Sequence, residues 1–510
     1  MTKAIPTILI LTISLLLVLI LAKGQMGLHE QLRFQYDYDI ARGGPFEASN
    51  SNSRYALTQA IVENGSFSFT DKQAKFASPD LVDYGGKYSS IFMPGVSFFG
   101  VPFYMLGVIA GAPQLFTYFS TILLAILNLY LVYKISNKLG AGKYASLFAG
   151  FVFLFTTNAI AYALTYTQHH LSAAIILLGI LTAFGERTWI KNLAFGVLFG
   201  AGLMTDIPNG LMLLPVLGYI LLNNFSLLEE KNRIVLSVKW KIIGLVLGVA
   251  PLFLAIGLYN FSVTGSYTTL GQSIGRVSYE KTLLPQENTN VIEEEDSSDS
   301  GFNSPLELKH IPNGLYILLI SNERGWIYYS PVIILGLIGL YLLSKNGGLG
   351  SVMFAVIGIN ILIYSMFGDP WGGWSFGPRY LIPATALTSV GLGLAIARFK
   401  RNSVFNLFLI LFVIYGLSIS IMGAMTSNNV PPKVEAIYFS DTVPYTYALN
   451  WQILQSGKSS SLFYDVYLAD QLPAFKFYIL YVVIAATGLI IFYLLKVNPE
   501  ENINPGNEQN

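Results

Sequence analysis

Residues able to do chemistry stand at the ends of long apolar runs in this sequence. His169 and His170 begin one run, Asp206 separates two others, and Arg324 and Arg379 precede later ones. Imidazole and carboxylate groups can move protons, and arginine binds anions through charge-assisted hydrogen bonds. A transporter would need ionisable groups near the middle of its spans, and these runs are almost free of charge. The pattern therefore favours a reaction at a membrane surface.

Arg379 is the strongest single candidate for binding an anion. It follows the glycine-rich segment WGGWSFGP, and glycine lets the backbone approach a bound group closely. A cation in this place suits a phosphate, and an ordinary interfacial arginine anchor is the alternative. Trp371 and Trp374 are candidates for contact with a sugar or a lipid. Arg324 has a similar place, although a structural ion pair with a neighbouring carboxylate is the alternative.

The composition places most of the chain in lipid. Hydrophobic residues make up 53% of the 510 residues, charged residues only 12%, and the mean hydropathy is +0.54. The net charge of +1 gives no reason to expect a nucleic-acid partner. The sequence has no cysteine, which excludes disulfides and cysteine nucleophiles, and it contains no phosphate-binding loop for ATP. Oxygen and nitrogen groups must therefore carry any chemistry.

About twelve apolar runs are long enough to cross a bilayer as helices. They lie near residues 5–21, 114–133, 144–165, 169–185, 191–204, 208–223, 241–261, 329–344, 350–367, 380–398, 404–424 and 476–496. The runs 191–204 and 208–223 are short and are separated by Asp206 and Pro208, which predicts a hairpin or a kinked pair. The predicted fold class is all-α, a polytopic helical membrane protein.

Lysine and arginine are concentrated in every alternate loop, which predicts that both termini are cytoplasmic. Three long segments, 23–113, 262–328 and 425–475, then lie outside. The stretch 92–110 is also apolar, but a crossing there would invert every later basic loop. We expect it to lie in the membrane interface, together with other interfacial helices of the first outer loop.

Several motifs resemble membrane glycosyltransferases of the GT-C superfamily, in particular dolichyl-phosphate-mannose mannosyltransferase-like proteins of the family 39 type. They are NSRYALTQAIVENGSFSF (52–69), PDLVDYGGKYSSIFMPGVSFFGVPFYMLG (79–107), SNERGWIYYSP (321–331) and WGGWSFGPRYLIP (371–383). The resemblance implies a hexosyltransferase that takes a sugar from a polyprenyl-phosphate donor. The acceptor would be a protein, lipid or glycan on the non-cytoplasmic side.

In that family an acidic residue of the first outer loop is thought to act as general base. Many members carry it just ahead of an Arg-Tyr pair, whereas this chain has Ser51, Asn52 and Ser53 before Arg54 and Tyr55. None of these three side chains is an effective base at neutral pH. The base is therefore expected elsewhere in the loop.

Four aspartates of the first outer loop are candidates for the base, and we prefer two of them. The preferred pair is Asp39 and Asp83, and the others are Asp37 and Asp80. Each could instead cap an interfacial helix or face solvent.

The remaining assignments also follow from the resemblance and from position in the chain. Arg54 and His169 join Arg379 and Arg324 as candidates for the donor phosphate, and Asn52 and Tyr55 join the two tryptophans as sugar or lipid contacts. The cofactor is unknown. Asp206, in the turn TDIPNG, is a candidate ligand for a divalent cation with another outer carboxylate, although no ligand spacing marks a dedicated metal site.

The resemblance divides the chain into a transmembrane catalytic module (1–424), an outer loop (425–475), and a last span with a cytoplasmic tail (476–510). Membrane lipids are expected partners. Two other functions stay open. A transporter or flippase for a lipid-linked or amphipathic solute would also explain twelve spans but not the long outer loops. A non-catalytic relative of the transferases would explain the missing acid before Arg54.

Overall fold

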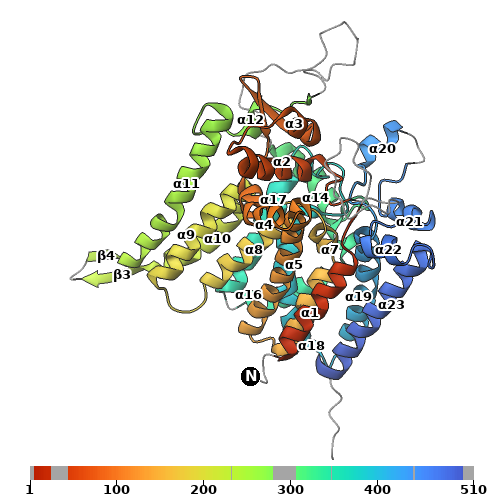
Figure 1. Cartoon of the computed structure of the whole chain (residues 1–510). Coiled ribbons are helices and arrows are strands. Elements are labelled where there is room, and N and C mark those ends of the chain that lie inside the picture. Colours follow the sequence, from red (N-terminus) through yellow and green to blue (C-terminus); the bar gives the residue numbers. More distant parts are fainter. Residues whose placement is uncertain are drawn as a thin grey trace, which may run out of the picture.

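The chain folds as a bundle of helices with two short β-hairpins, as Figure 1 shows for the computed structural model. The structure describes residues 5–24, 44–230, 233–279, 306–345, 347–439 and 443–497. Within these ranges the predicted all-α class is confirmed, and the protein is an integral membrane protein with many apolar helices.

Thirteen apolar helices form the bundle in the described part of the chain. Six are long enough to cross a membrane by length and composition: α5 (Pro113–Lys138), α10 (Ile207–Asn224), α11 (Ile243–Thr264), α18 (Ile382–Phe399), α19 (Ser403–Ala424) and α23 (Ala474–Phe492). Seven are shorter: α1 (Ile5–Ile20), α4 (Gly95–Ile109), α6 (Lys143–Phe155), α8 (His169–Thr182), α9 (Trp189–Thr205), α16 (Ile333–Ser344) and α17 (Leu349–Ser365). Every predicted run coincides with one of these helices, and the additional helix is α4.

Two breaks interrupt the apolar helices, one between two predicted runs and one within a predicted run. Helix α9 ends at Thr205 and α10 begins at Ile207, with an extended backbone at Asp206 between them. The break predicted at Asp206 is therefore confirmed. The run 144–165 forms α6 and then the short helix α7 (Ala159–Ala163), because the chain leaves the helical path at Thr156.

Helix α18 lies at the centre of the bundle, packed against α5, α6, α8 and α16. Its contact with α16 is close because glycines face each other across it. A Cβ added at Gly339 would come within 1.9 Å of the Gly391 carbonyl oxygen. Small residues of this kind let helix backbones approach in membranes, where dispersion contacts take the place of a hydrophobic driving force.

Short elements cover one end of the bundle, which we call the site end. They include α2 (Ser49–Asn64), α3 (Asp71–Ala77), α12 (Gly271–Ile274), α14 (Ile311–Leu319), α15 (Trp326–Tyr329), α20 (Lys433–Phe439), α21 (Ala448–Gln455), α22 (Leu462–Tyr467) and the hairpin β1 (Leu81–Tyr84)–β2 (Lys87–Ser90). The helices predicted for the first outer loop are thus present (Figure 1).

The opposite end of the bundle carries the second hairpin, β3 (Phe225–Glu230)–β4 (Arg233–Val238), which the sequence analysis did not predict. The first residues of α1 and the last residues of α23 lie toward this same end in Figure 1. This arrangement agrees with two termini on one side of the membrane. That this side is cytoplasmic stays a prediction.

Candidate functional site

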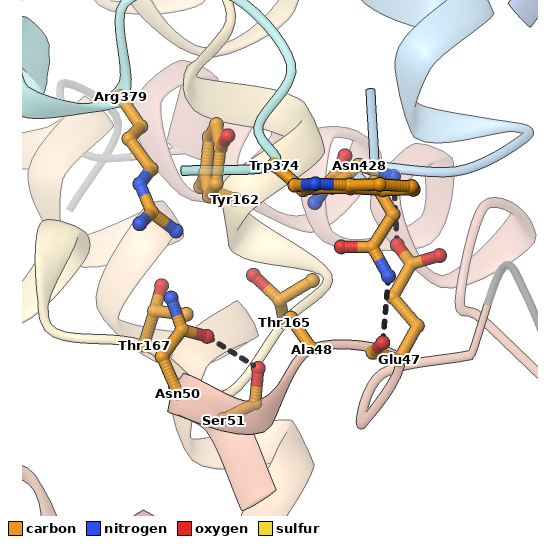
Figure 2. Close-up of a pocket in the computed structure, with 11 residues that line it drawn as sticks. Glu47, Ala48, Asn50, Ser51, Tyr162, Thr165, Thr167, Trp374, Arg379 and Asn428 are labelled. Atoms are coloured by element: carbon orange, nitrogen blue, oxygen red, sulfur yellow. Dashed lines mark hydrogen bonds between the residues drawn. The ribbon is translucent and has the colours of Figure 1, made fainter. Parts of the chain in front are cut away.

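A pocket at the site end brings together four segments that are far apart in the sequence. They are the start of α2, the α7–α8 connection, the glycine-rich loop before α18, and the chain after α19. The residues that line the pocket are Glu47, Ala48, Asn50, Ser51, Tyr162, Thr165, Thr167, Trp374, Arg379, Asn428 and Asn429 (Figure 2). Part of the loop 425–475, which the sequence analysis set apart from the catalytic module, therefore contributes to the pocket.

Glu47 carries the only carboxylate among the described residues that line this pocket. Its side chain accepts hydrogen bonds from Ser427 Oγ at 2.6 Å and from the backbone N–H of Asn428 at 2.7 Å. The ammonium of Lys23 lies 3.3 Å from Oε1. The sequence analysis did not select this residue, since its candidates were aspartates. It precedes α2 in the segment FEASNSNSRY, a few residues ahead of the Arg-Tyr pair.

Arg379 enters the pocket from the opposite side, with its guanidinium directed toward Asn50 and Thr167 in Figure 2. The glycine-rich loop allows this position. Gly372 has a φ of 72°, and a Cβ there would come within 3.0 Å of Arg379 Nε. Nε of Arg379 has no hydrogen-bond partner among the described residues, although it is buried. An unsatisfied buried donor is costly, so this group is suited to receive an anion.

Tyr162, Thr165 and Thr167 form the floor between these two charged groups. The Tyr162 hydroxyl accepts a hydrogen bond from the backbone N–H of Phe376 at 3.0 Å, which ties the floor to the Arg379 loop. The hydroxyls of Thr165 and Thr167 are buried and have no partner in the described part of the chain. The pocket thus holds several polar groups without partners, as expected of a binding site rather than of a packed core.

His169 lies behind the floor and does not line the pocket. Its ring centroid is 5.0 Å from that of Tyr162 and 6.4 Å from that of Tyr380. Its Nε2 is buried with no hydrogen-bond partner in the described ranges. The structure therefore places His169 close to Arg379, as the sequence suggested, but behind an aromatic layer. His170, by contrast, bonds the Ala159 carbonyl and Asn128.

Arg54 lies in α2 in a buried layer next to the pocket. Its guanidinium stacks over the Phe92 ring at 3.9 Å and donates to the Asn50 carbonyl at 2.8 Å. Burial lowers the pKa of Arg54 to about 10, while the charges of Asp206 and Asp80 oppose the shift. Arg54 reaches the pocket only through Asn50, so a direct phosphate contact stays a prediction.

Arg324, a predicted ligand of the donor phosphate, is held in a buried network of hydrogen bonds. It is fully buried, and its nitrogens donate to Ser375 Oγ at 2.9 Å and to the carbonyls of Glu323 and Val430 at 2.9 and 2.8 Å. It does not line the pocket. These bonds join the Arg379 loop to the chain after α19, and a contact of Arg324 with the donor phosphate stays a prediction.

Asn52 and Tyr55 also differ from the prediction of sugar or lipid contacts. Both are buried on the inner side of α2. Tyr55 packs against the rings of Phe46 and Phe76, with centroids 4.8 and 6.2 Å away. Asn52 donates to the Phe76 carbonyl at 3.2 Å. The helix turns Asn50 and Ser51 toward the pocket instead.

The two tryptophans of the glycine-rich loop are placed differently from each other. Trp374 lines the pocket (Figure 2). Its indole N–H donates to Glu435. Trp371 does not line the pocket, and its carbonyl accepts from Arg324 and Ser375. Of the two, only Trp374 lines the pocket, and a sugar or lipid contact stays a prediction.

Of the two preferred aspartates the structure describes only Asp83, which does not line the pocket. Asp39, with Asp37, lies outside the described residues. Asp83 lies in the β1–β2 hairpin, where it accepts from the Gly86 N–H at 3.0 Å and stabilises the turn. Asp80 is buried and bonds Ser49 and Arg276. The structure therefore moves the carboxylate candidate from Asp83 to Glu47.

Asp206 accepts a hydrogen bond from the Tyr364 hydroxyl at 3.3 Å. The described residues contain no group of three or more His, Cys, Asp or Glu side chains that could hold a metal ion. The positive charge of Arg54 also acts on Asp206. The cation suggested for Asp206 stays a prediction.

Comparisons with known proteins give the following matches. No protein-family model and no curated protein matches the chain. Among solved structures, ArnT from Cupriavidus metallidurans is similar in its apo state over 97% of this chain and 78% of that one, with 11% identity and a TM-score of 0.46. The same protein bound to undecaprenyl phosphate is similar over 96% of this chain and 78% of that one. The identity is 11% and the TM-score is 0.45.

The archaeal oligosaccharyltransferase AglB from Archaeoglobus fulgidus, solved with an inhibitory peptide and a dolichol-phosphate, is similar over 84% of this chain and 56% of its own. The identity is 10% and the TM-score is 0.46. At this level of similarity, function has to be inferred from the chain's own residues.

Proposed function

We propose that this protein is a glycosyltransferase that takes a sugar from a polyprenyl-phosphate-linked donor and passes it to a hydroxyl or amide acceptor at the site end. The proposal is based mainly on the position of Arg379 and Glu47, which lie on opposite sides of one pocket in a membrane-embedded bundle. The motif resemblance to GT-C transferases supports the same reaction class. The sugar and the acceptor are not specified by these residues.

Arg379 is the proposed ligand of the donor phosphate. Arginine binds phosphate oxygens through two parallel N–H bonds, and its Nε–H has no other partner in the described part of the protein. The hydroxyls of Thr165 and Thr167 lie on the same floor and can donate to the remaining oxygens. This arrangement would stabilise the charge that develops on the leaving polyprenyl phosphate.

Glu47 is the proposed general base. In the step, the acceptor oxygen or nitrogen bonds to the anomeric carbon while the bond from that carbon to the phosphate oxygen breaks. The electron pair of the broken bond leaves with the polyprenyl phosphate, and the acceptor proton passes to the Glu47 carboxylate. The base replaces Asp39 and Asp83 in this role because it lines the pocket.

The test is transfer of radiolabelled sugar from a panel of polyprenyl-phosphate donors by purified protein in lipid, with membrane extracts as the source of acceptors. Arg379→Ala and Glu47→Gln should each abolish most transfer while the protein stays folded. Arg398→Ala, at the opposite end of α18 and exposed, is the matched control. If no donor is consumed by wild type, or if both variants keep full activity, the proposal fails.

A further inference from the structure

A buried ion pair joins the end of the first span to the pocket. The ammonium of Lys23 lies 3.3 Å from Glu47 Oε1, and the two side chains are 0% and 1% exposed. Such pairs often add little net stability, because removing both charges from water is expensive. Burial lowers the pKa of Lys23, and the attraction of Glu47 opposes this shift. Because burying this ion pair is expensive and adds little stability, we looked for a functional reason for it.

Two parts of the fold fix the position of Lys23. Its backbone N–H donates to the Tyr118 hydroxyl of α5 at 2.9 Å. The residue forms a β-bridge with Ser461, and the N–H of the next residue donates to the Ser460 carbonyl at 2.9 Å. The cation is therefore held by α5 and by the chain before α22, and it does not depend on the pocket for its place.

The charged and titratable groups around Glu47 come from several elements. Lys23 is in contact with it, and Arg379 and Tyr162 line the same pocket. Arg379 is the group that the proposed function assigns to the donor phosphate, so its charge is neutralised when donor binds. Lys23 then remains as the positive group in contact with the Glu47 carboxylate in the loaded site.

We propose that Lys23 is a positioning residue, whose ammonium holds the Glu47 carboxylate by an ion pair and fixes it beside the pocket while it receives the acceptor proton. Lys23 itself neither gains nor loses a proton in the step. The proposal rests on the proposed function, because that function makes Glu47 the base. It adds that the outer end of the first span is part of the catalytic apparatus.

The experiment compares Lys23→Met with Lys309→Met, which breaks an exposed ion pair with Glu307. Sugar transfer by folded protein in lipid is measured across pH, with donor KM and kcat determined separately. For Lys23→Met we expect kcat to fall about tenfold or more and the acidic limb of kcat to move up by about one pH unit, with donor KM nearly unchanged. Lys23→Arg should keep the wild-type limb, and Lys309→Met should match wild type.

Each outcome separates this proposal from the function on which it rests. If Lys23→Met keeps the wild-type kcat and acidic limb while Glu47→Gln abolishes transfer, the positioning role is wrong and the proposed function stands. If Glu47→Gln keeps full activity, the assignment of the base is wrong and the positioning role falls with it. Should Lys23→Met fail to fold, Lys23→Gln retains a hydrogen-bond donor without the charge and carries the same test.

Discussion

The two arginines at the site end, Arg324 and Arg379, have similar sequence surroundings and opposite bonding. Arg324 donates to a hydroxyl and to carbonyls from three parts of the chain. Arg379 has a buried Nε–H for which the described residues provide no acceptor. Both follow turn-forming residues and precede an apolar helix.

Burial alone therefore does not distinguish an arginine with a structural role from one that binds a ligand. What distinguishes them is how many of the guanidinium donors are already used. Arg324 holds the loop that presents Arg379, because it bonds Ser375 and the Trp371 carbonyl of that loop. Arg324 therefore helps to fix the loop that positions Arg379.

Replacing Arg379 should have the largest effect, and that effect should be on ligand affinity. We expect Arg379→Met to weaken binding of a polyprenyl phosphate by about 10- to 100-fold, because a hydrogen bond to a charged group contributes about 1.5–3 kcal/mol. Equilibrium binding of radiolabelled polyprenyl phosphate to protein in lipid measures this. Arg398→Met should bind normally, and an unchanged affinity for Arg379→Met would remove the phosphate role.

Replacing Arg324 should act on stability instead. Arg324→Met leaves buried carbonyls without donors, and each unsatisfied group costs about 1–3 kcal/mol. We expect a lower midpoint in thermal unfolding in detergent. The folded fraction should lose less affinity for polyprenyl phosphate than Arg379→Met does. A stable Arg324→Met protein with the larger loss of affinity would reverse the two roles.

Two adjacent glycines allow a finer test of the Arg379 loop. Gly372 and Gly373 both have positive φ, so alanine at either should cost about 1–2 kcal/mol. Only Gly372 approaches Arg379: its added Cβ would lie 3.0 Å from Nε, whereas that of Gly373 has its nearest contact at 3.8 Å, with Asp369. We expect Gly372→Ala to lose a few-fold more affinity for polyprenyl phosphate than Gly373→Ala. Equal losses would show that the contact is unimportant.

The smallest effect is expected at Asp83, which the sequence pointed to as a base. Asp83→Asn keeps an oxygen that can accept from the Gly86 N–H. We expect sugar transfer to stay within about twofold of wild type and stability to change by about 0.5 kcal/mol or less. Sugar transfer by Asp83→Asn, measured alongside Glu47→Gln, tests this expectation. A loss at Asp83 as large as that at Glu47 would return the base to the hairpin.

Much of the fold could be predicted because lipid imposes simple rules. Each apolar run became a helix, and the break at Asp206 followed from turn-forming residues. Arg379 could be found because a glycine-rich loop precedes it. The hairpin β3–β4 was not predicted, since its strands FSLLEE and RIVLSV are short and lack a strict alternation of apolar and polar residues.

Glu47 could not be found in the same way, because its place depends on distant partners. Its side chain bonds Ser427 and Asn428, which lie some 380 residues later in the chain. The hydrogen bonds of Arg324 could not be predicted for the same reason, since its acceptor Val430 is also remote in sequence. Local sequence signals indicate which groups are charged, and the tertiary fold decides which of them have partners.

The hydrogen bonds between α1 and the segment near α22 have a consequence for folding during synthesis. Ser461 Oγ donates to the Ile20 carbonyl, the Leu462 N–H donates to that of Ala22, and the Tyr481 hydroxyl donates to that of Leu17. Helix α1 is translated long before α22 and α23, so it finds these neighbours only after the segments between them have been made. Until they arrive, Lys23 and Glu47 lack their final surroundings. The pocket of a nascent chain can therefore be completed only after α22 has been translated.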